Sequence, residues 1–226
     1  MKIGAGIIFY NDGISLKRCL DSIADNIDII FAIDGKFPNF PNNQPLTSTD
    51  GSNELVKSYS NAVLVHYVAT EFNKRQHYLE LCKEHNVDVL LIIDSDEYVL
   101  EDISNFQVFK EMLTRIIIQR DKGSKNVYAI PIRQPNGTYL AYPRIWYRPE
   151  EMEYYDGRHY FFRNKYPVGH PLHKENLPHQ ANHSVNTING LLLGHNHELR
   201  SKEHMASRFE YQRWLCDYEN KLPLSL

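Results

Sequence analysis

A run of apolar residues that ends in acids constrains this chain more than any other feature. Val89 to Ile93 is apolar throughout, and Asp94, Asp96 and Glu97 follow within the next four residues. A short, continuous apolar run predicts a strand buried on both faces, as in a parallel sheet. Such a strand would deliver its acids to an edge of the core, where they can meet a ligand.

The spacing of the first two acids suggests one use for them. Side chains alternate along an extended segment, so Asp94 and Asp96 would lie on the same side of the chain. There they could share one hard cation with the oxygens of a substrate such as a diphosphate. The alternative is an acidic turn that caps the next helix, which is the commoner origin of an isolated Asp-x-Asp.

The first hundred residues alternate between strand and helix patterns. Helices are indicated by the i, i+3, i+4 spacing of Leu16, Cys19, Leu20 and Ile23, and by the segments 52–60 and 71–86. Strands are indicated at 6–10, 28–33, 62–68 and in the acidic run. This order predicts an α/β fold whose mostly parallel central sheet is flanked by helices, in a single domain spanning 1–226.

Polar residues follow several of these expected strands. Asn11 and Asp12 end the first strand, Asp34 ends the second, and Asp94 ends the acidic one. Ligands of open parallel sheets gather at the carboxyl ends of the strands. We therefore expect these residues to converge in one cleft. Lys74 and Arg75 open the third helix, where we expect at least one of them to be solvated.

The second half of the chain is less regular and rich in aromatic residues between 139 and 166. These rings either form a wall that binds sugar faces or cover one side of the sheet, and the pattern favours neither. A short apolar run at 191–194 precedes His195 and His197. On an extended segment the two imidazoles face one way and could bind a metal, or they are surface loop residues.

Composition excludes some classes of function. The net charge is −3 and acids and bases are interspersed, so a nucleic-acid partner is not expected. No stretch approaches the roughly twenty apolar residues that cross a bilayer, which predicts a soluble, cytoplasmic protein with no transmembrane segment. The three cysteines, Cys19, Cys82 and Cys216, are read as reduced core residues. The C-terminus has no ending signal, which suits a piece of a longer multidomain chain.

The motifs together resemble a known family. Phe9-Tyr10-Asn11-Asp12, with Leu16 and the segment Cys19–Ile23, is similar to the opening of family 2 glycosyltransferases, which have the GT-A fold. Asp34-Gly35 and Ser48–Ser52 resemble that family's Asp-rich nucleotide loop, with an insertion between its halves. Asp94-Ser95-Asp96-Glu97 is similar to the metal-binding Asp-x-Asp turn.

The resemblance implies a reaction and a division of the chain. It implies transfer of a sugar, with inversion, from a nucleotide-diphosphate sugar donor to a saccharide or other hydroxyl acceptor. Residues 1–100 would form the nucleotide-binding half and residues 101–226 the acceptor-binding half, which is irregular and aromatic-rich.

The resemblance also implies roles for particular residues. Mn²⁺ or Mg²⁺ would be held by Asp94 and Asp96, with His195 or His197 completing the site. The general base would be Asp156, or Glu153 as a second choice. The donor would be bound by a larger set, Tyr10, Asn11, Asp34, Asp50, Lys74, Arg75, Asp94 and Ser95.

Other classes of enzyme fit the sequence less well than a glycosyltransferase. A phosphohydrolase of the haloacid dehalogenase type carries its Asp-x-Asp on the first strand with Thr or Val two residues further on, whereas here the motif comes late and Tyr98 holds that position. A nucleotidyltransferase would carry an arginine soon after a Gly-rich loop, whereas the first basic residue after Gly4-Ala5-Gly6 is Lys17. A domain that binds nucleotide sugars or carbohydrate without turnover remains an alternative.

Overall fold

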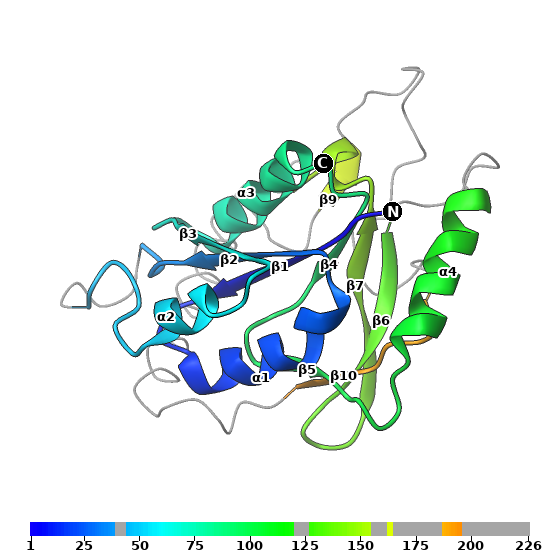
Figure 1. Ribbon diagram of the computed structural model, residues 1–226, viewed down its shortest axis with the longest axis horizontal. Coiled ribbons are helices and arrows are strands. Elements are labelled where there is room, and N and C mark those ends of the chain that lie inside the picture. Colours follow the sequence, from blue (N-terminus) through cyan, green and yellow to red (C-terminus); the bar gives the residue numbers. More distant parts are fainter. Residues whose placement is uncertain (39–43, 120–126, 155–161, 165–186, 196–226) are drawn as a thin grey trace, which may run out of the picture.

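A mixed α/β fold is seen in the computed structural model of the chain. The structure describes residues 1–38, 44–119, 127–154, 162–164 and 187–195. One eight-stranded sheet has the order β3-β2-β1-β4-β7-β6-β10-β5, and β8 and β9 form a separate two-stranded sheet. The predicted α/β fold with a mostly parallel central sheet flanked by helices is therefore confirmed (Figure 1).

The first four strands form the parallel half of the sheet. Their bounds are β1 Ile3–Phe9, β2 Ile29–Asp34, β3 Ala62–His66 and β4 Val89–Ile92. β1 lies between β2 and β4, and β2 pairs with β3, all in parallel. The register aligns Phe9 with Asp34, so the carboxyl ends of β1 and β2 lie at the same edge. This edge collects the polar residues that follow each strand.

The later strands extend the sheet with mixed directions. Their bounds are β5 Glu97–Val99, β6 Val127–Arg133, β7 Tyr139–Tyr147 and β10 Leu193–His195, with β8 Met152–Tyr154 and β9 Phe162–Asn164 apart. β7 is antiparallel to both β4 and β6, whereas β10 is parallel to β6 and antiparallel to β5. A hairpin joins β6 and β7, with Gly137 in its turn at a φ of 81°.

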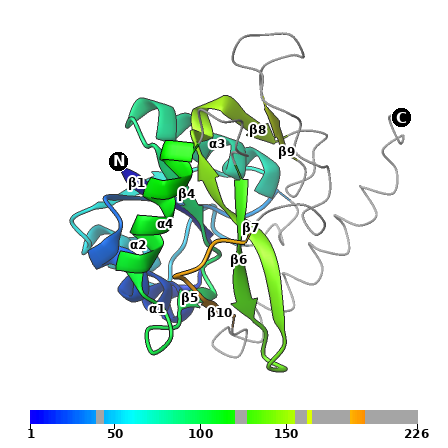
Figure 2. The same ribbon diagram turned by 90° about the vertical axis from the view of Figure 1, so that its right-hand side faces the viewer.

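Helices cover both faces of the sheet and create two cores (Figure 2). Their bounds are α1 Gly13–Ile23, α2 Ser52–Lys57, α3 Glu71–Glu84 and α4 Phe106–Gln119, with 3-10 turns at Ala24–Asn26 and Pro149–Glu151. Side chains of α1, α2 and α4 pack on one face, while those of α3 pack on the other. Each fully buried Leu or Ile stabilises the fold by about 1.5–3 kcal/mol.

Strand β2 shows why the parallel strands read as continuous apolar runs. Ile30 and Ala32 point into the first core, whereas Ile29, Phe31 and Ile33 point into the second. A central strand with helices on both sides has no solvent-facing positions, so alternation of polar and apolar residues is lost.

The acidic run departs from an extended strand at its end. β4 stops at Ile92, and the Glu97 amide donates to the Asp94 carbonyl at 2.9 Å, which closes a tight turn. The chain then enters β5, which pairs with β10 and not with β4. The alternation of an extended segment therefore does not apply at Asp94 and Asp96.

Some expectations can be compared directly with the described residues, and others cannot. Cys19 and Cys82 are free and buried, as expected, whereas Cys216 lies outside the described residues. Asp156 and His197 also lie outside them. Within the described part of the chain, no helix is both long and apolar enough to cross a bilayer.

Candidate functional site

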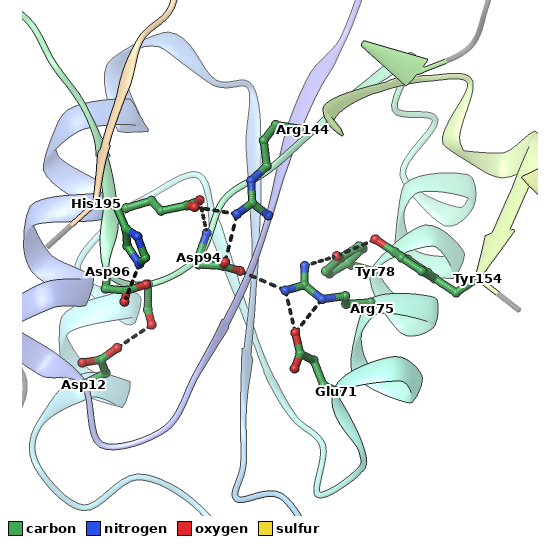
Figure 3. Close-up of polar contacts among 11 residues, drawn as sticks. Asp12, Glu71, Arg75, Tyr78, Asp94, Asp96, Arg144, Tyr154 and His195 are labelled. Atoms are coloured by element: carbon green, nitrogen blue, oxygen red, sulfur yellow. Dashed lines mark hydrogen bonds and ion pairs between the residues drawn. The ribbon is translucent and has the colours of Figure 1, made fainter. Parts of the chain in front are cut away.

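Charged and polar side chains from five parts of the fold meet at the carboxyl ends of β1 and β4 (Figure 3). They come from the end of β1, from the first half of α3, from the turn after β4 and from strands β7 and β10. We call this set the carboxyl-edge cluster: Asp12, Glu71, Arg75, Asp94, Ser95, Asp96, Glu97, Arg144 and His195.

Two arginines hold the carboxylate of Asp94. Arg75 donates from Nη2 to Asp94 Oδ1 at 2.9 Å, and Arg144 donates from Nη2 to Oδ2 at 3.0 Å. Arg75 also binds Glu71 Oε1, one helical turn earlier, at 2.7 Å. The side chains of Arg75 and Arg144 are only 8% and 13% exposed. Charge-assisted hydrogen bonds of this kind are about twice as strong as neutral ones, so Asp94 is fixed in position.

Glu97 is a buried member of the same cluster. Its side chain is 2% exposed, Arg144 binds its Oε1, and the Asp94 amide donates to Oε2 at 2.9 Å. Burial raises the pKa of Glu97 to about 7, against the lowering effect of Arg144, and the charges of Asp94 and Asp96 add to the rise. The ion pair with Arg144 is what keeps a carboxylate tolerable at this depth.

Asp96 faces a different partner from Asp94. Its buried carboxylate lies 3.1 Å from His195 Nε2, measured to Oδ2. His195 ends β10 and stands opposite Glu97 in the β5 register, which sets its approach to Asp96. Burial lowers the pKa of His195, but the hydrogen bond and charge of Asp96 outweigh it, so the net pKa is raised.

Asp12 and Ser95 link the ends of β1 and β4 beside that pair. The Ser95 hydroxyl donates to Asp12 Oδ2, and both side chains are buried. The contact joins residues 83 positions apart in the sequence. Asp12 was expected to reach the shared cleft, and this hydrogen bond places it next to the Asp-x-Asp turn.

The donor atoms of these residues indicate how a divalent metal would fit. Asp96 and His195 offer one oxygen and one nitrogen 3.1 Å apart, a donor set that a divalent transition metal accepts. Asp94 is already bound by two guanidinium groups. Among the described residues, no group of three or more His, Cys, Asp and Glu side chains is arranged to hold a metal ion. They supply a pair of ligands, and His197 lies outside them.

Asp34, at the end of β2, binds a neighbouring loop. Its carboxylate is fully buried and accepts from the Ser48 amide, at 3.1 Å to Oδ1 and 3.0 Å to Oδ2. The Ser48 hydroxyl donates to Oδ1 at 2.6 Å, and His66 Nδ1 lies 3.2 Å from Oδ2. These contacts hold the segment 45–52 over the carboxyl ends of β1 and β2.

Tyr10, Asn11 and Asp50 anchor the same segment. The Tyr10 hydroxyl donates to the Pro45 carbonyl at 2.6 Å, and the Thr49 amide donates to Asn11 Oδ1 at 2.8 Å. Asp50 accepts from the Gly13 amide at 2.9 Å, joining the segment to the start of α1. We call residues 45–52 with these anchors the edge loop. The structure thus brings four of the eight predicted donor-binding residues, Tyr10, Asn11, Asp34 and Asp50, together around a loop.

Lys74 and Arg75 correct the expectation that one of them is solvated. Lys74 is fully buried and Arg75 is 7% exposed, because the first turn of α3 packs against the strand ends. Lys74 Nζ donates to the Gly35 carbonyl and lies 4.6 Å from the centroid of the Phe37 ring. Burial lowers the pKa of Lys74 to about 8, although Asp34 and Glu71 oppose the change.

The aromatic residues of the second half, where they are described, mainly build the core. Trp146 and Tyr154 are buried with ring centroids 4.9 Å apart. The Tyr154 hydroxyl lies 3.2 Å from that of Tyr78, which accepts from Arg75 Nη1 at 3.1 Å. Glu153 lies beside this contact on β8 and is half-buried.

Sequence reasoning missed two members of the cluster, Arg144 and Glu71, and gave Glu97 no role beyond its place in the acidic run. Arg144 follows Pro143 on an antiparallel strand and belongs to no motif near Asp94. A signal did exist, because an arginine directly before the buried run Ile145-Trp146-Tyr147 needs an acidic partner. Nothing in the sequence indicates which acid that partner is.

Comparisons with known proteins bear on the fold. No protein-family model matches the chain, and no curated protein matches its sequence. Among solved structures, S. aureus TarS 1-349 is 20% identical with a TM-score of 0.44, covering 61% of this chain and 37% of that one. Its complex with UDP-GlcNAc is 20% identical with a TM-score of 0.41, covering 61% and 36%.

A third solved structure is glucosyl-3-phosphoglycerate synthase from Mycobacterium tuberculosis, with Mn²⁺, UDP and glucosyl-3-phosphoglycerate. It is 13% identical with a TM-score of 0.35, covering 60% of this chain and 45% of that one. The chain therefore spans less than half the length of these solved chains. Similarity at this level does not carry the activities of these proteins to this chain.

Proposed function

We propose that this chain transfers a sugar from a nucleotide-diphosphate donor to a hydroxyl acceptor. The observation that carries the proposal is the carboxyl-edge cluster, in which Asp96 and His195 lie beside the arginine-bound Asp94. The cluster stands at the edge where open parallel sheets bind ligands. The resemblance to family 2 glycosyltransferases gives the same expectation from sequence motifs alone.

The cluster places two guanidinium groups where a leaving diphosphate needs positive charge. Its acids outnumber these groups, so the divalent ion proposed below must supply further positive charge. Departure of a nucleoside diphosphate leaves negative charge on phosphate oxygens, and preorganised cations lower the energy of that transition state. Arg75 and Arg144 are held rigidly by Asp94 and Glu97, so little reorganisation is required of them. Lys74, one residue from Arg75, adds an amine next to the end of β2.

Mn²⁺ or Mg²⁺ is proposed as the cofactor, with Asp96 and His195 as the chain's ligands. When bound there, a divalent ion would supply Lewis-acid stabilisation of the negative charge that develops on the leaving diphosphate. Asp94 would then act through its arginines, keeping both guanidinium groups near the phosphates. Ser95 and Asp12 would orient the turn that carries Asp96.

The remaining roles follow the earlier expectations. Tyr10, Asn11, Asp34 and Asp50 would bind the nucleoside, which requires their contacts with the edge loop to be shared or exchanged. A general base must accept the proton of the acceptor hydroxyl, and Asp156 is proposed for this role, with Glu153 as the second choice. Residues 101–226 would contribute to the acceptor side, and the transfer would invert the anomeric carbon.

A domain that binds nucleotide sugars without turnover is the second candidate. It is favoured by one observation: the carboxylate of Asp94, a metal ligand in the family that the sequence resembles, is held by Arg75 and Arg144. Release of nucleoside diphosphate separates the two candidates, because a binding domain leaves the donor intact.

The test is release of nucleoside diphosphate from a panel of uridine, guanosine, adenosine and thymidine diphosphate sugars with Mn²⁺. We expect one nucleotide class to be turned over, and Asp96→Asn to lower the rate by about 100-fold or more. Glu84→Gln, an exposed change at the end of α3, is the matched control and should leave the rate unchanged.

Metal titration assigns the ligands separately. By calorimetry, Asp96→Asn and His195→Ala should each weaken Mn²⁺ binding about 10-fold or more. Asp94→Asn should weaken it less, because Asp94 is held by arginines. Equal affinity in all three variants, or no diphosphate release from any donor, would contradict the proposal.

A further inference from the structure

A groove runs between α1 and the residues that follow the Asp-x-Asp turn. It has a volume of about 680 Å³, within the range of roughly 300–1,000 Å³ typical of ligand sites. A second hollow of about 350 Å³ continues it. The two share Asp21, Ser22, Val99 and Glu101, so together they form one elongated depression, which we call the α1 groove.

Both walls of the α1 groove begin beside the carboxyl-edge cluster. Ile14 lies on one wall, two residues after Asp12, and Tyr98 lies on the other, two residues after Asp96. α1, β5 and β10 lie side by side, and α1 contacts β5 (Figure 1). A ligand in this groove therefore has one end next to the proposed site of transfer.

Tyr98 connects the groove to His195. It stands opposite Gly194 in the β5–β10 register, directly before His195. A Cβ at position 194 would lie 2.5 Å from the Tyr98 ring, so only glycine lets the ring pack flat against β10. A ligand that contacts Tyr98 thus touches the strand that positions the imidazole.

Arg18 is the cation at the inner end of the α1 groove, which is the end nearer the carboxyl-edge cluster. Its guanidinium carbon lies 3.5 Å from the centroid of the Tyr98 ring, a close stacking contact. The described part of the chain gives Arg18 no ion pair with a carboxylate. Stacking fixes the guanidinium plane and leaves its N–H groups available to oxygen acceptors.

The outer part of the groove carries hydrogen-bond acceptors. Asp25, Glu101 and Asp102 are exposed, and no ion pair with a described residue involves them. Asn26 and Asn105 supply amide groups nearby. Lys17 is paired with Asp21 at 2.6 Å, so the unpaired charges of the groove, among the described residues, are these three carboxylates and Arg18. The carboxylates repel a polyanion, and Arg18 disfavours a cationic group at the inner end. A chain of hydroxyl groups both donates and accepts, so it satisfies both ends.

We propose that the α1 groove binds a neutral saccharide chain, which is the acceptor of the transfer. The identification of this saccharide as the acceptor rests on the proposed function. Its binding in the α1 groove does not depend on that function. The chain would lie along α1 with its reactive end near Asp12 and Asp96. Arg18 and Glu101 would be its main hydrogen-bonding partners, and neither belongs to the carboxyl-edge cluster.

Binding is tested first, without any donor. The full chain, labelled with ¹⁵N, is titrated with maltohexaose, cellopentaose and laminarihexaose, and with hexamers of galacturonic acid and of glucosamine. A neutral oligomer should shift the amides of α1 and of residues 98–106. Arg18→Ala and Glu101→Gln should each weaken that binding about fivefold. Lys57→Ala, an exposed change at the end of α2, is the matched control.

The outcomes separate this proposal from the proposed function. Shifts in the groove with a neutral oligomer support it even if no donor is turned over. Shifts confined to other surfaces, or the tightest binding by the galacturonic acid or glucosamine hexamer, overturn it even if a donor is hydrolysed. Where transfer is measurable, Arg18→Ala should raise the acceptor KM about fivefold and leave donor hydrolysis without acceptor unchanged. An unchanged acceptor KM also overturns the proposal.

Discussion

The edge loop and the carboxyl-edge cluster use aspartate in opposite ways. At the end of β2, Asp34 accepts hydrogen bonds from the amide and hydroxyl of Ser48 and from His66. At the end of β4, Asp94 is bound by Arg75 and Arg144. Neutral donors position a loop at modest cost, whereas buried ion pairs become costly when one partner is lost. The two regions should therefore respond differently to single substitutions.

Removing Arg144 should have the largest effect on stability. Arg144→Met leaves the buried Glu97 without its cation and removes one of the two arginines on Asp94. Breaking a buried pair from one side costs about 3–5 kcal/mol, and urea unfolding measures that loss. The double variant Arg144→Met/Glu97→Gln should recover much of it, because the orphaned charge is gone. A single variant as stable as the wild type would mean that the cluster is no more sensitive than the edge loop.

Lys74 lies between the two regions, and the pH dependence of stability reports on its burial there. Its pKa falls from 10.5 to about 8 on folding, because burial disfavours the charged amine. The unfolded chain therefore holds more protons between pH 8 and 10.5, and stability from this group rises with pH across that window. Below pH 8 the full penalty, on the order of 3 kcal/mol, is present.

The measurement is the difference between wild type and Lys74→Met. Unfolding free energies at pH 7, 8, 9 and 10 should show the variant at its greatest relative advantage at pH 7, with the gap closing as pH rises. Lys57→Met, at an exposed position, should give no such trend. A difference that stays constant with pH would contradict the lowered pKa of Lys74.

A change at Asp34 should cost less than one at Arg144. Asp34→Asn keeps the shape but turns an amide donor toward Ser48 or His66, and we expect a loss of about 2 kcal/mol. Hydrogen exchange of the Ser48 amide should also become faster. Glu84→Gln should stay within about 0.5 kcal/mol of the wild type. A loss as large as that of Arg144→Met would erase the contrast between the regions.

The smallest effect is expected at Asp50, which joins the edge loop to α1 and α2. It accepts from the amides of Gly13 and Ser52, in the manner of a helix cap. Asp50→Ala should cost about 1 kcal/mol, and Asp50→Asn should retain part of it. Thermal unfolding of both variants checks the order, and an alanine variant no weaker than the asparagine variant would argue against a capping role.

Much of the fold was predictable because it depends on local periodicity. The apolar spacing of Leu16, Cys19 and Leu20 marks α1, and the continuous runs at β2 and β4 mark central strands. Burial on both faces removes polar positions from such strands, so each run and the turn that ends it can be seen in the sequence. The gathering of Asp34 and the Asp-x-Asp turn at one edge follows from parallel pairing.

The sequence alone determined which strands are parallel and which acids stand at their carboxyl ends. The tertiary structure decided what each acid contacts. Asp94 and Asp96 contact different partners because a turn begins at Asp94 and because Arg144 lies on β7. Strand β10 brings His195 to Asp96, although the two residues are 99 positions apart in the sequence. Such pairings depend on the packing of distant strands, and a side chain's nearest charge is not encoded by its neighbours in the chain.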